Sequence, residues 1–302
     1  MQAIMVEYFD FPKDNIISLF NEDATYHNIR KQFSEISKSA EKNDRVLIFF
    51  AGHGETLDLP EGGEQGYLLP YDGDRDDLYL TAVPMDELKQ IALMSKAKHI
   101  LYLVDACYGG IAAIGSRGLD SKTTPHYIEK ITQNKARQII TAGGRGEKVI
   151  EKSEWGHSAF TKNLLSGLRD SKADTDSDGI ITAQELGTYL KKKVTIDSNN
   201  QQTPKTRNLS TDEGEFVFTL DENISNSTLD FPTSDIENNI KIDSHQTSKV
   251  VKLRSFYIGA INNGLGLGIQ GGWYLDEGKS EMGGNVSFAD AAQSNLDLIQ
   301  SI

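Results

Sequence analysis

One histidine and the only cysteine of this 302-residue chain have the residue types and the neighbours of a nucleophilic catalyst. His53 lies between Gly52 and Gly54, and Cys107 is followed by Tyr108 and two glycines. A thiolate can attack a carbonyl carbon, and a nearby imidazole can protonate the amine that leaves. Because glycines let the backbone turn sharply, the Gly54 and Cys107 amides can reach the same cleft and hold an oxyanion.

Each of the two residues alone has a simpler interpretation. A lone cysteine is usually a small core residue, and a lone histidine is usually structural. The catalytic interpretation depends on their joint placement, because each one closely follows a continuous apolar run, at residues 46–50 and 100–104. Such runs predict strands buried on both faces, and in parallel sheets the reactive groups lie beyond the C-terminal ends of the strands.

The wider pattern predicts an α/β fold with a doubly wound, mostly parallel sheet flanked by helices. The predicted strands are residues 15–20, 46–50, 100–104 and 138–142, and the predicted helices are residues 26–40 and 85–94. Residues 221–248 are rich in Asn, Ser, Thr and Asp, which predicts a flexible linker. Residues 249–302 contain aromatic and β-branched residues and an Asn263-Gly264 turn, which predicts a small, partial β-rich C-terminal segment.

Six short segments share the order and spacing of a known family. They are residues 50–54 (FAGHG), 67–70 (YLLP), 103–110 (LVDACYGG), 141–145 (TAGGR), 156–161 (GHSAFT) and 202–204 (QTP). Together they resemble the caspase/metacaspase superfamily, and in particular the bacterial caspase-like peptidases of family C14. The 54-residue separation of His53 and Cys107 also fits the caspase signature. The resemblance covers residues 5–220 and implies a caspase-like fold, with a peptidase domain at residues 1–220.

The resemblance implies a cysteine-type endopeptidase, a thiol protease with His53 and Cys107 as its catalytic pair and the Gly54 and Cys107 amides as its oxyanion hole. That chemistry requires no cofactor. Family members begin with a strand and a helix upstream of anything present here, so we expect the domain to be N-terminally incomplete. The alternative is a non-catalytic caspase-like module that binds calcium or serves as a scaffold; the missing strand favours it, and the retained pair argues against it.

Asp105 departs from the caspase signature, which has glutamine at this position, and matches metacaspases and their bacterial relatives. A carboxylate two residues before the nucleophile points into the neighbouring pocket, where it can pair with arginine or lysine. The resemblance and the charge both favour Asp105 as a substrate-binding residue, and cleavage of protein or peptide substrates after basic residues. The alternative is a structural carboxylate that accepts hydrogen bonds from loop amides.

Residues 174–185 match a calcium-binding EF-hand loop, with acidic residues at positions 1, 3, 5 and 12 and a glycine at position 6. Helices are predicted on both sides, at residues 158–169 and 183–193, which gives an EF-hand-like helix–loop–helix. The candidate metal ligands are the carboxylates of Asp174, Asp176, Asp178 and Glu185, the carbonyl of Ile180, and Thr182 directly or through water. The pattern therefore predicts Ca2+ binding, and calcium control of activity is a hypothesis.

The calcium interpretation also has an alternative, an acidic turn that caps the second helix without a metal. A second group of acidic residues has a weaker pattern, and we interpret it as a solvated loop. It consists of Asp72, Asp74, Asp76 and Asp77.

The bulk composition disfavours several kinds of partner and location. The net charge of −13 disfavours nucleic acid and anionic membrane surfaces, which attract basic patches, and it suits a basic substrate or a cation. The longest apolar runs are about six residues, whereas a membrane span needs roughly 20. Since the N-terminus also lacks the pattern of a signal peptide, we expect a cytoplasmic protein. Nothing in the pattern fixes the number of subunits.

Overall fold

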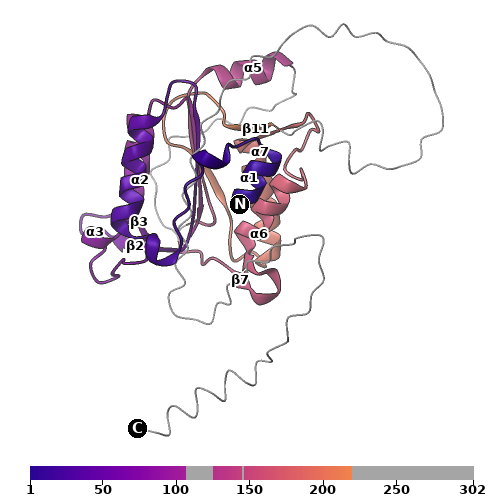
Figure 1. The fold of residues 1–302 in the computed structure, drawn as a ribbon. Coiled ribbons are helices and arrows are strands. Elements are labelled where there is room, and N and C mark those ends of the chain that lie inside the picture. The colour runs from indigo at the N-terminus through magenta and orange to yellow at the C-terminus, as the bar shows by residue number, and fades with distance from the viewer. Residues whose placement is uncertain (107–124, 145, 220–302) are drawn as a thin grey trace, which may run out of the picture. The chain divides into compact units, whose positions relative to one another are not determined.

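The structure is a computed structural model that describes residues 1–106, 125–144 and 146–219. Cys107, the expected linker at residues 221–248 and the expected β-rich segment at residues 249–302 lie outside the described residues (Figure 1). None of the helices in the described part of the chain combines the length and the hydropathy needed to cross a bilayer.

A four-stranded sheet forms the centre of the fold, in the order β1-β5-β6-β10. β1 (Arg45–Ala51), β5 (His99–Asp105) and β6 (Ala136–Thr141) are parallel, and β10 (Lys205–Asn208) runs antiparallel to β6. Every residue of β5 and β6 is buried, which explains the continuous apolar run at residues 100–104 of β5; β6 also buries the polar side chains of Arg137 and Gln138. The predicted α/β fold with a mostly parallel sheet is confirmed.

Helices cover both faces of this sheet, and alternate residues of each strand supply the two cores. Val46 and Ile48 pack with α2 and α4, whereas Leu47 and Phe49 pack with α1, α6 and α7. Figure 1 shows α2 on one side of the strands and α1, α6 and α7 on the other. These helices are α1 (Gln2–Tyr8), α2 (Tyr26–Ser39), α4 (Met85–Met94), α6 (Ala159–Arg169) and α7 (Ala183–Asp197).

Smaller elements surround the central layers. β2, β3 and β4 form a three-stranded antiparallel sheet, and β7 and β8 form a short hairpin. Their bounds are β2 (His53–Asp58), β3 (Glu64–Leu69), β4 (Val83–Pro84), β7 (Glu151–Lys152) and β8 (His157–Ser158). The remaining helices are α3 (Leu78–Thr81), α5 (Pro125–Gln133) and the 3-10 turns η1 (Lys13–Asn15), η2 (Asn21–Asp23) and η3 (Ser153–Trp155).

The expectation of a strand at residues 15–20 is wrong. Residues 16–20 form no regular element and lie between η1 and η2. Ile16 packs against the core on the α6 and α7 side, and Leu19 is buried in the core on the α2 side. Ile16 and Leu19 therefore pack against two different cores, and their segment does not pair in a sheet.

A helix–loop–helix is present where the sequence predicts one, because α6 and α7 flank an acidic loop. Within it, β9 (Ile180–Thr182) pairs antiparallel with β11 (Val217–Thr219), and Ile181 lies opposite Phe218. The Phe218 ring contacts Phe9, with 5.2 Å between ring centroids. The loop is therefore joined through β11 to the core beneath α1.

Gln202 fixes the loop that follows β6. Its fully buried side chain donates from Nε2 to the Ala142 carbonyl (2.9 Å) and accepts at Oε1 from the Ile150 amide (2.9 Å). Next to it, Glu147 Oε2 accepts from the amides of Gly144 and Thr203, each at 2.8 Å. The end of β6 and the beginning of the β7–β8 hairpin are thus held by one side chain.

We expect Gln202→Ala to lower the free energy of unfolding by about 2–4 kcal/mol, because it removes the partner of the buried Ala142 carbonyl and of the partly buried Ile150 amide. Gln201→Ala is the matched control, since Gln201 is exposed, and it should change stability by less than about 0.5 kcal/mol. Urea unfolding of both variants checks this, and equal losses would contradict the role given to Gln202.

Candidate active site

His53 lies at the C-terminal edge of the central sheet. β1 ends at Ala51, which pairs with Asp105, the last residue of β5. The Gly52 amide then donates to the Asp105 carbonyl (3.1 Å), and His53 follows as the first residue of β2, half-buried and opposite Leu69. His53 therefore lies one residue beyond Gly52, whose amide makes the last backbone hydrogen bond to β5.

The structure brings His53, Gly54 and Asp105 to this same edge. Cys107 lies outside the described residues, two positions after Asp105 in the chain. The contact between His53 and Cys107, and the oxyanion role of the Gly54 and Cys107 amides, stay predictions.

The Asp105 carboxylate is buried, with 5% of the residue exposed. Its Oδ2 accepts a very short hydrogen bond from Ser158 Oγ and another from Thr161 Oγ1 (2.5 Å). Its Oδ1 is also buried and has no hydrogen-bond partner within the described residues. Sequence reasoning noted the GHSAFT segment but missed this role of Ser158 and Thr161; the available signal was a serine placed where a helix begins.

The N-terminus of α6 creates the environment of this carboxylate. Ser158 is the N-cap of α6 and accepts from the Thr161 amide (2.9 Å), so the positive end of the helix dipole faces Asp105. Burial nevertheless raises the pKa of the Asp105 carboxyl to about 6, against the lowering effect of the two hydroxyl hydrogen bonds; the negative charge of Glu151 raises it further.

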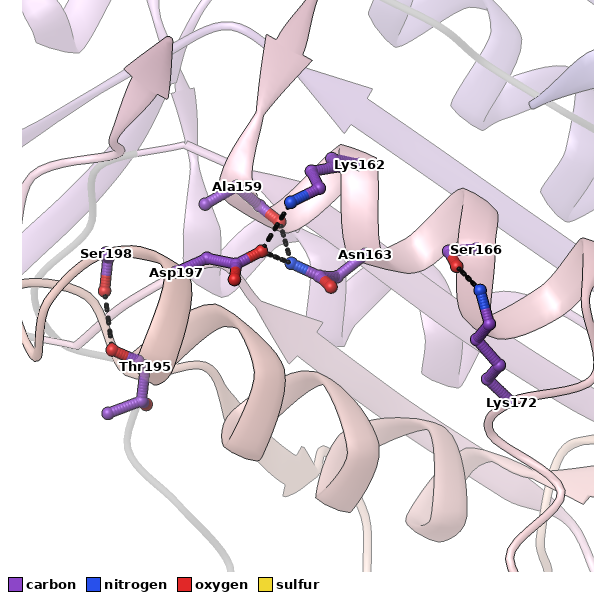
Figure 2. A network of polar contacts seen from close by, with 8 residues as sticks. All are labelled: Ala159, Lys162, Asn163, Ser166, Lys172, Thr195, Asp197 and Ser198. Atoms are coloured by element: carbon purple, nitrogen blue, oxygen red, sulfur yellow. Dashed lines mark hydrogen bonds and ion pairs between the residues drawn. The ribbon is translucent and has the colours of Figure 1, made fainter. Parts of the chain in front are cut away.

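A polar network holds the start of α6 against the end of α7 (Figure 2). Asp197 Oδ2 accepts from Lys162 Nζ (2.8 Å) and from Asn163 Nδ2 (2.9 Å), and Asn163 also donates to the Ala159 carbonyl (2.9 Å). Burial alone would raise the pKa of Asp197, but these hydrogen bonds outweigh it and lower the pKa. The network fixes the helix that presents Ser158 to Asp105.

Trp155 packs beside this network, in the turn of the β7–β8 hairpin. The ammonium nitrogens of Lys152 and Lys162 lie 4.3 Å and 4.6 Å from the centre of its ring. The half-buried ring also packs against the core that contains α6. Trp155 thus anchors the hairpin to α6.

The acidic loop before α7 gathers three of its predicted ligands. Carboxylate oxygens of Asp174, Asp176 and Glu185 lie within 4.8 Å of one another. The two oxygens of Asp174 accept from the amides of Asp178 (3.2 Å) and Gly179 (3.0 Å), and Gly179 has a φ of 82°, a conformation that favours glycine. This is a closed turn with its carboxylates directed inward.

The other predicted ligands are placed differently. Thr182 is the N-cap of α7 and forms a capping box with Glu185, and Ile180 begins β9. Asp178 Oδ1 accepts from the Ile180 amide (2.9 Å). Burial raises the pKa of Asp174 and Asp178, and the negative charge of Glu185 adds to the increase. A hard cation with oxygen ligands, such as Ca2+, fits this donor set and would relieve the repulsion.

The second acidic group forms turns, in agreement with its interpretation as a solvated loop. Asp72 Oδ1 accepts from the amide of Tyr26 at the start of α2 (2.7 Å). Asp74 Oδ1 accepts from the Asp76 amide (2.9 Å), and Asp77 is the N-cap of α3. All four carboxylate-bearing residues are exposed.

A parallel α/β sheet with a histidine and a buried carboxylate at its C-terminal edge is an arrangement suited to an enzyme. The family model of the caspase domain, peptidase C14, matches residues 1–213. The chain therefore belongs to the caspase-domain peptidase family, and this membership supports a cysteine peptidase.

Two known proteins show the similarity at different levels. Metacaspase-7 of Arabidopsis thaliana is 27% identical over 192 residues, which is 58% of this chain and 42% of the relative. The chain thus spans less than half the length of that curated relative. The crystal structure of protein GSU0716 from Geobacter sulfurreducens matches with a TM-score of 0.43 and 16% identity, over 65% of this chain and 77% of that chain.

We expect Asp105→Asn to stabilise the protein at neutral and alkaline pH. Because the folded pKa is about 6 and the unfolded value about 3.9, the folded state binds more protons between these values, and stability falls as the pH rises through this window. Removing the charge should therefore raise the free energy of unfolding by about 1–3 kcal/mol at pH 8, and the gain should disappear below about pH 4.

Urea unfolding across the pH range checks this, with Asp197→Asn as a control of the opposite sign, since the pKa of Asp197 is lowered. If the Asp105→Asn chain is less stable than the native chain at pH 8, the expectation is wrong.

Proposed function

We propose that this chain is a cysteine endopeptidase that cleaves peptide bonds after arginine or lysine. Family membership supports the peptidase chemistry, and the Asp105 environment supports the preference for a basic residue. The net charge of −13 also suits a cationic substrate.

In the proposed reaction the Cys107 thiolate attacks the carbonyl carbon of the scissile peptide bond. The Gly54 and Cys107 amides donate to the oxyanion of the tetrahedral intermediate. His53 gives its proton to the leaving amine as the carbon–nitrogen bond breaks, which leaves a thioester. The neutral imidazole then takes a proton from water, the resulting hydroxide attacks the thioester, and the thiolate leaves.

The observation that carries the specificity is that Asp105 Oδ1 is buried and has no hydrogen-bond partner among the described residues. A buried carboxylate oxygen that accepts no hydrogen bond is costly, and a guanidinium or ammonium group would supply the missing donor and charge. Asp105 pairs with Ala51, two residues before His53, and precedes Cys107 by two residues. A side chain bound to Asp105 therefore belongs to the residue next to the scissile bond.

Fluorogenic peptides with Arg, Lys or Asp before the scissile bond test this function. We expect cleavage after Arg and Lys, and a loss of at least about 1000-fold in kcat/KM in His53→Ala and Cys107→Ala. His27→Ala, at an exposed histidine, is the matched control and should retain activity. Cleavage only after Asp would contradict the specificity, and no cleavage by the native chain would favour the non-catalytic alternative.

We also propose that residues 174–185 bind Ca2+ and that this binding modulates activity. The support is the gathered carboxylates of Asp174, Asp176 and Glu185 and the EF-hand pattern of the loop. A bound cation would supply charge neutralisation and no catalytic step. Since β9 pairs with β11, whose Phe218 packs on Phe9, a tighter loop would stabilise the core on that face of the sheet.

We expect Ca2+ at a hundredfold excess over its Kd to raise the free energy of unfolding by about 2–3 kcal/mol. Glu185→Gln should abolish this gain while keeping the capping box, because glutamine can still accept from the Thr182 amide. Asp170→Asn, an acidic residue paired with Arg169 and Lys172, is the control and should keep the response. Calorimetry with Ca2+ and with chelator measures the effect, and an equal response in native and Glu185→Gln chains would exclude this site.

A further inference from the structure

The small antiparallel sheet extends the candidate active site on the side of His53. β2 begins with His53, and within the described residues it pairs with β3 alone, so it is the edge strand of the β2-β3-β4 sheet. His53, Glu55 and Leu57 alternate along β2, so their side chains project from one face of the strand. This face leads away from His53 toward the tip of the β2–β3 hairpin.

The short helix α3 covers the same face of the small sheet. Leu69 of β3 lies directly opposite His53, and Tyr67 lies on the same face two residues earlier. Leu78 of α3 packs against the buried cluster that contains Tyr67 and Leu69. Figure 1 also shows α3 beside β2 and β3. The outer residues of α3 therefore lie near His53.

Large apolar side chains on this part of the protein are exposed. Nine large apolar residues of the described chain are exposed, and five of them lie between residues 57 and 80. Tyr79 and Leu80 of α3 are 81% and 65% exposed, and Leu57 of β2 is 46% exposed. Single exposed apolar residues are common on protein surfaces, whereas a concentration of them beside a functional residue is typical of a binding surface.

The proposed reaction indicates which part of a substrate meets this surface. His53 protonates the leaving amine, so the nitrogen of the scissile bond and the residues after it lie on the side of His53. The residue before the scissile bond is placed by Asp105, which contacts Ser158 of the β7–β8 hairpin. The substrate chain after the scissile bond therefore passes along β2 and α3.

The charges around the surface favour an apolar occupant over an acidic one. Glu55 lies between His53 and Leu57 on the same face, and its Oε1 is paired with Arg75 Nε at 3.0 Å. The loop before α3 adds four exposed acidic residues, which would repel an acidic segment. They are Asp72, Asp74, Asp76 and Asp77.

We propose that Leu57, Tyr79 and Leu80 form a docking surface for apolar substrate residues that follow the scissile bond. The proposal rests on the proposed function, because it takes His53 as the residue that protonates the leaving amine. Leu57 lies four residues beyond His53 in the strand, a distance of about 13 Å that about four extended substrate residues also span. The surface adds a second recognition element to the basic residue before the bond.

Internally quenched peptides that share one sequence up to arginine test this surface. After the arginine they continue with Ser-Leu-Leu-Leu or with four serines. The native chain should cleave the leucine peptide with a kcat/KM about 10-fold higher than that of the serine peptide. Tyr79→Ala and Leu57→Ala should each lower this leucine-to-serine ratio to about 3-fold or less, because they remove apolar contact area.

Two controls accompany this comparison. Leu93→Ala, at an exposed leucine near the C-terminal end of α4, is the matched variant and should keep the native ratio. A fluorogenic peptide that ends in arginine has no residue after the scissile bond, and all four chains should cleave it equally.

The outcomes distinguish failure of the docking surface from failure of the proposed function. If the arginine-ending peptide is cleaved but the leucine-to-serine ratio is near one, or is unchanged in both Tyr79→Ala and Leu57→Ala, the docking surface is wrong and the proposed function stands. An unchanged ratio together with a native dimer that dissociates in Tyr79→Ala, measured by sedimentation, would assign the surface to a second copy of this chain. A native chain that cleaves none of these peptides would overturn the proposed function, and the docking surface with it.

Discussion

The hydrogen bonds from the Ser158 and Thr161 hydroxyls to the Asp105 carboxylate connect the two parts of this protein that its chemistry needs. Asp105 ends β5, the strand that leads to Cys107, and Ser158 is the N-cap of α6, the helix that covers one face of the sheet. This contact brings the end of β5, the N-terminus of α6 and the β7–β8 hairpin together. Hydrogen bonds to Asp197 fix α6, and the hydrogen bond from the Ile150 amide to Gln202 fixes the start of the hairpin.

The buried Asp105 carboxylate also lowers the stability of the fold. In the part of the chain that the structure describes, only one oxygen of this buried charge is hydrogen-bonded. Burial of the charge destabilises the native state at neutral pH, and the raised pKa reflects that destabilisation. Apolar cores on both faces of the sheet offset it. A cationic substrate would pair with this carboxylate, and binding would then offset the destabilisation that the buried charge causes in the free protein.

Much of the fold could be predicted from the sequence, because its strongest signals are local. The continuous apolar runs predict β1, β5 and β6, and helical periodicity predicts α2 and α4. The segment at residues 15–20 was mispredicted because local pattern does not distinguish pairing in a sheet from packing against two cores. The hydroxyls on Asp105, and Glu151 beside them, come from positions about 50 residues later in the chain. Only the pairing of β7 with β8 brings Glu151 next to Ser158, and no local pattern encodes that register.

We propose that the Asp105 carboxylate binds a positively charged side chain of the substrate. Carbon-13 NMR of the aspartate carboxyls measures this directly, with Asp105→Asn to identify the resonance and a peptide aldehyde ending in arginine as the ligand. We expect Asp105 to titrate near pH 6 in the free protein, and its pKa to fall by about two when the guanidinium binds. A pKa that is the same with and without the bound peptide would show that Asp105 does not pair with the arginine.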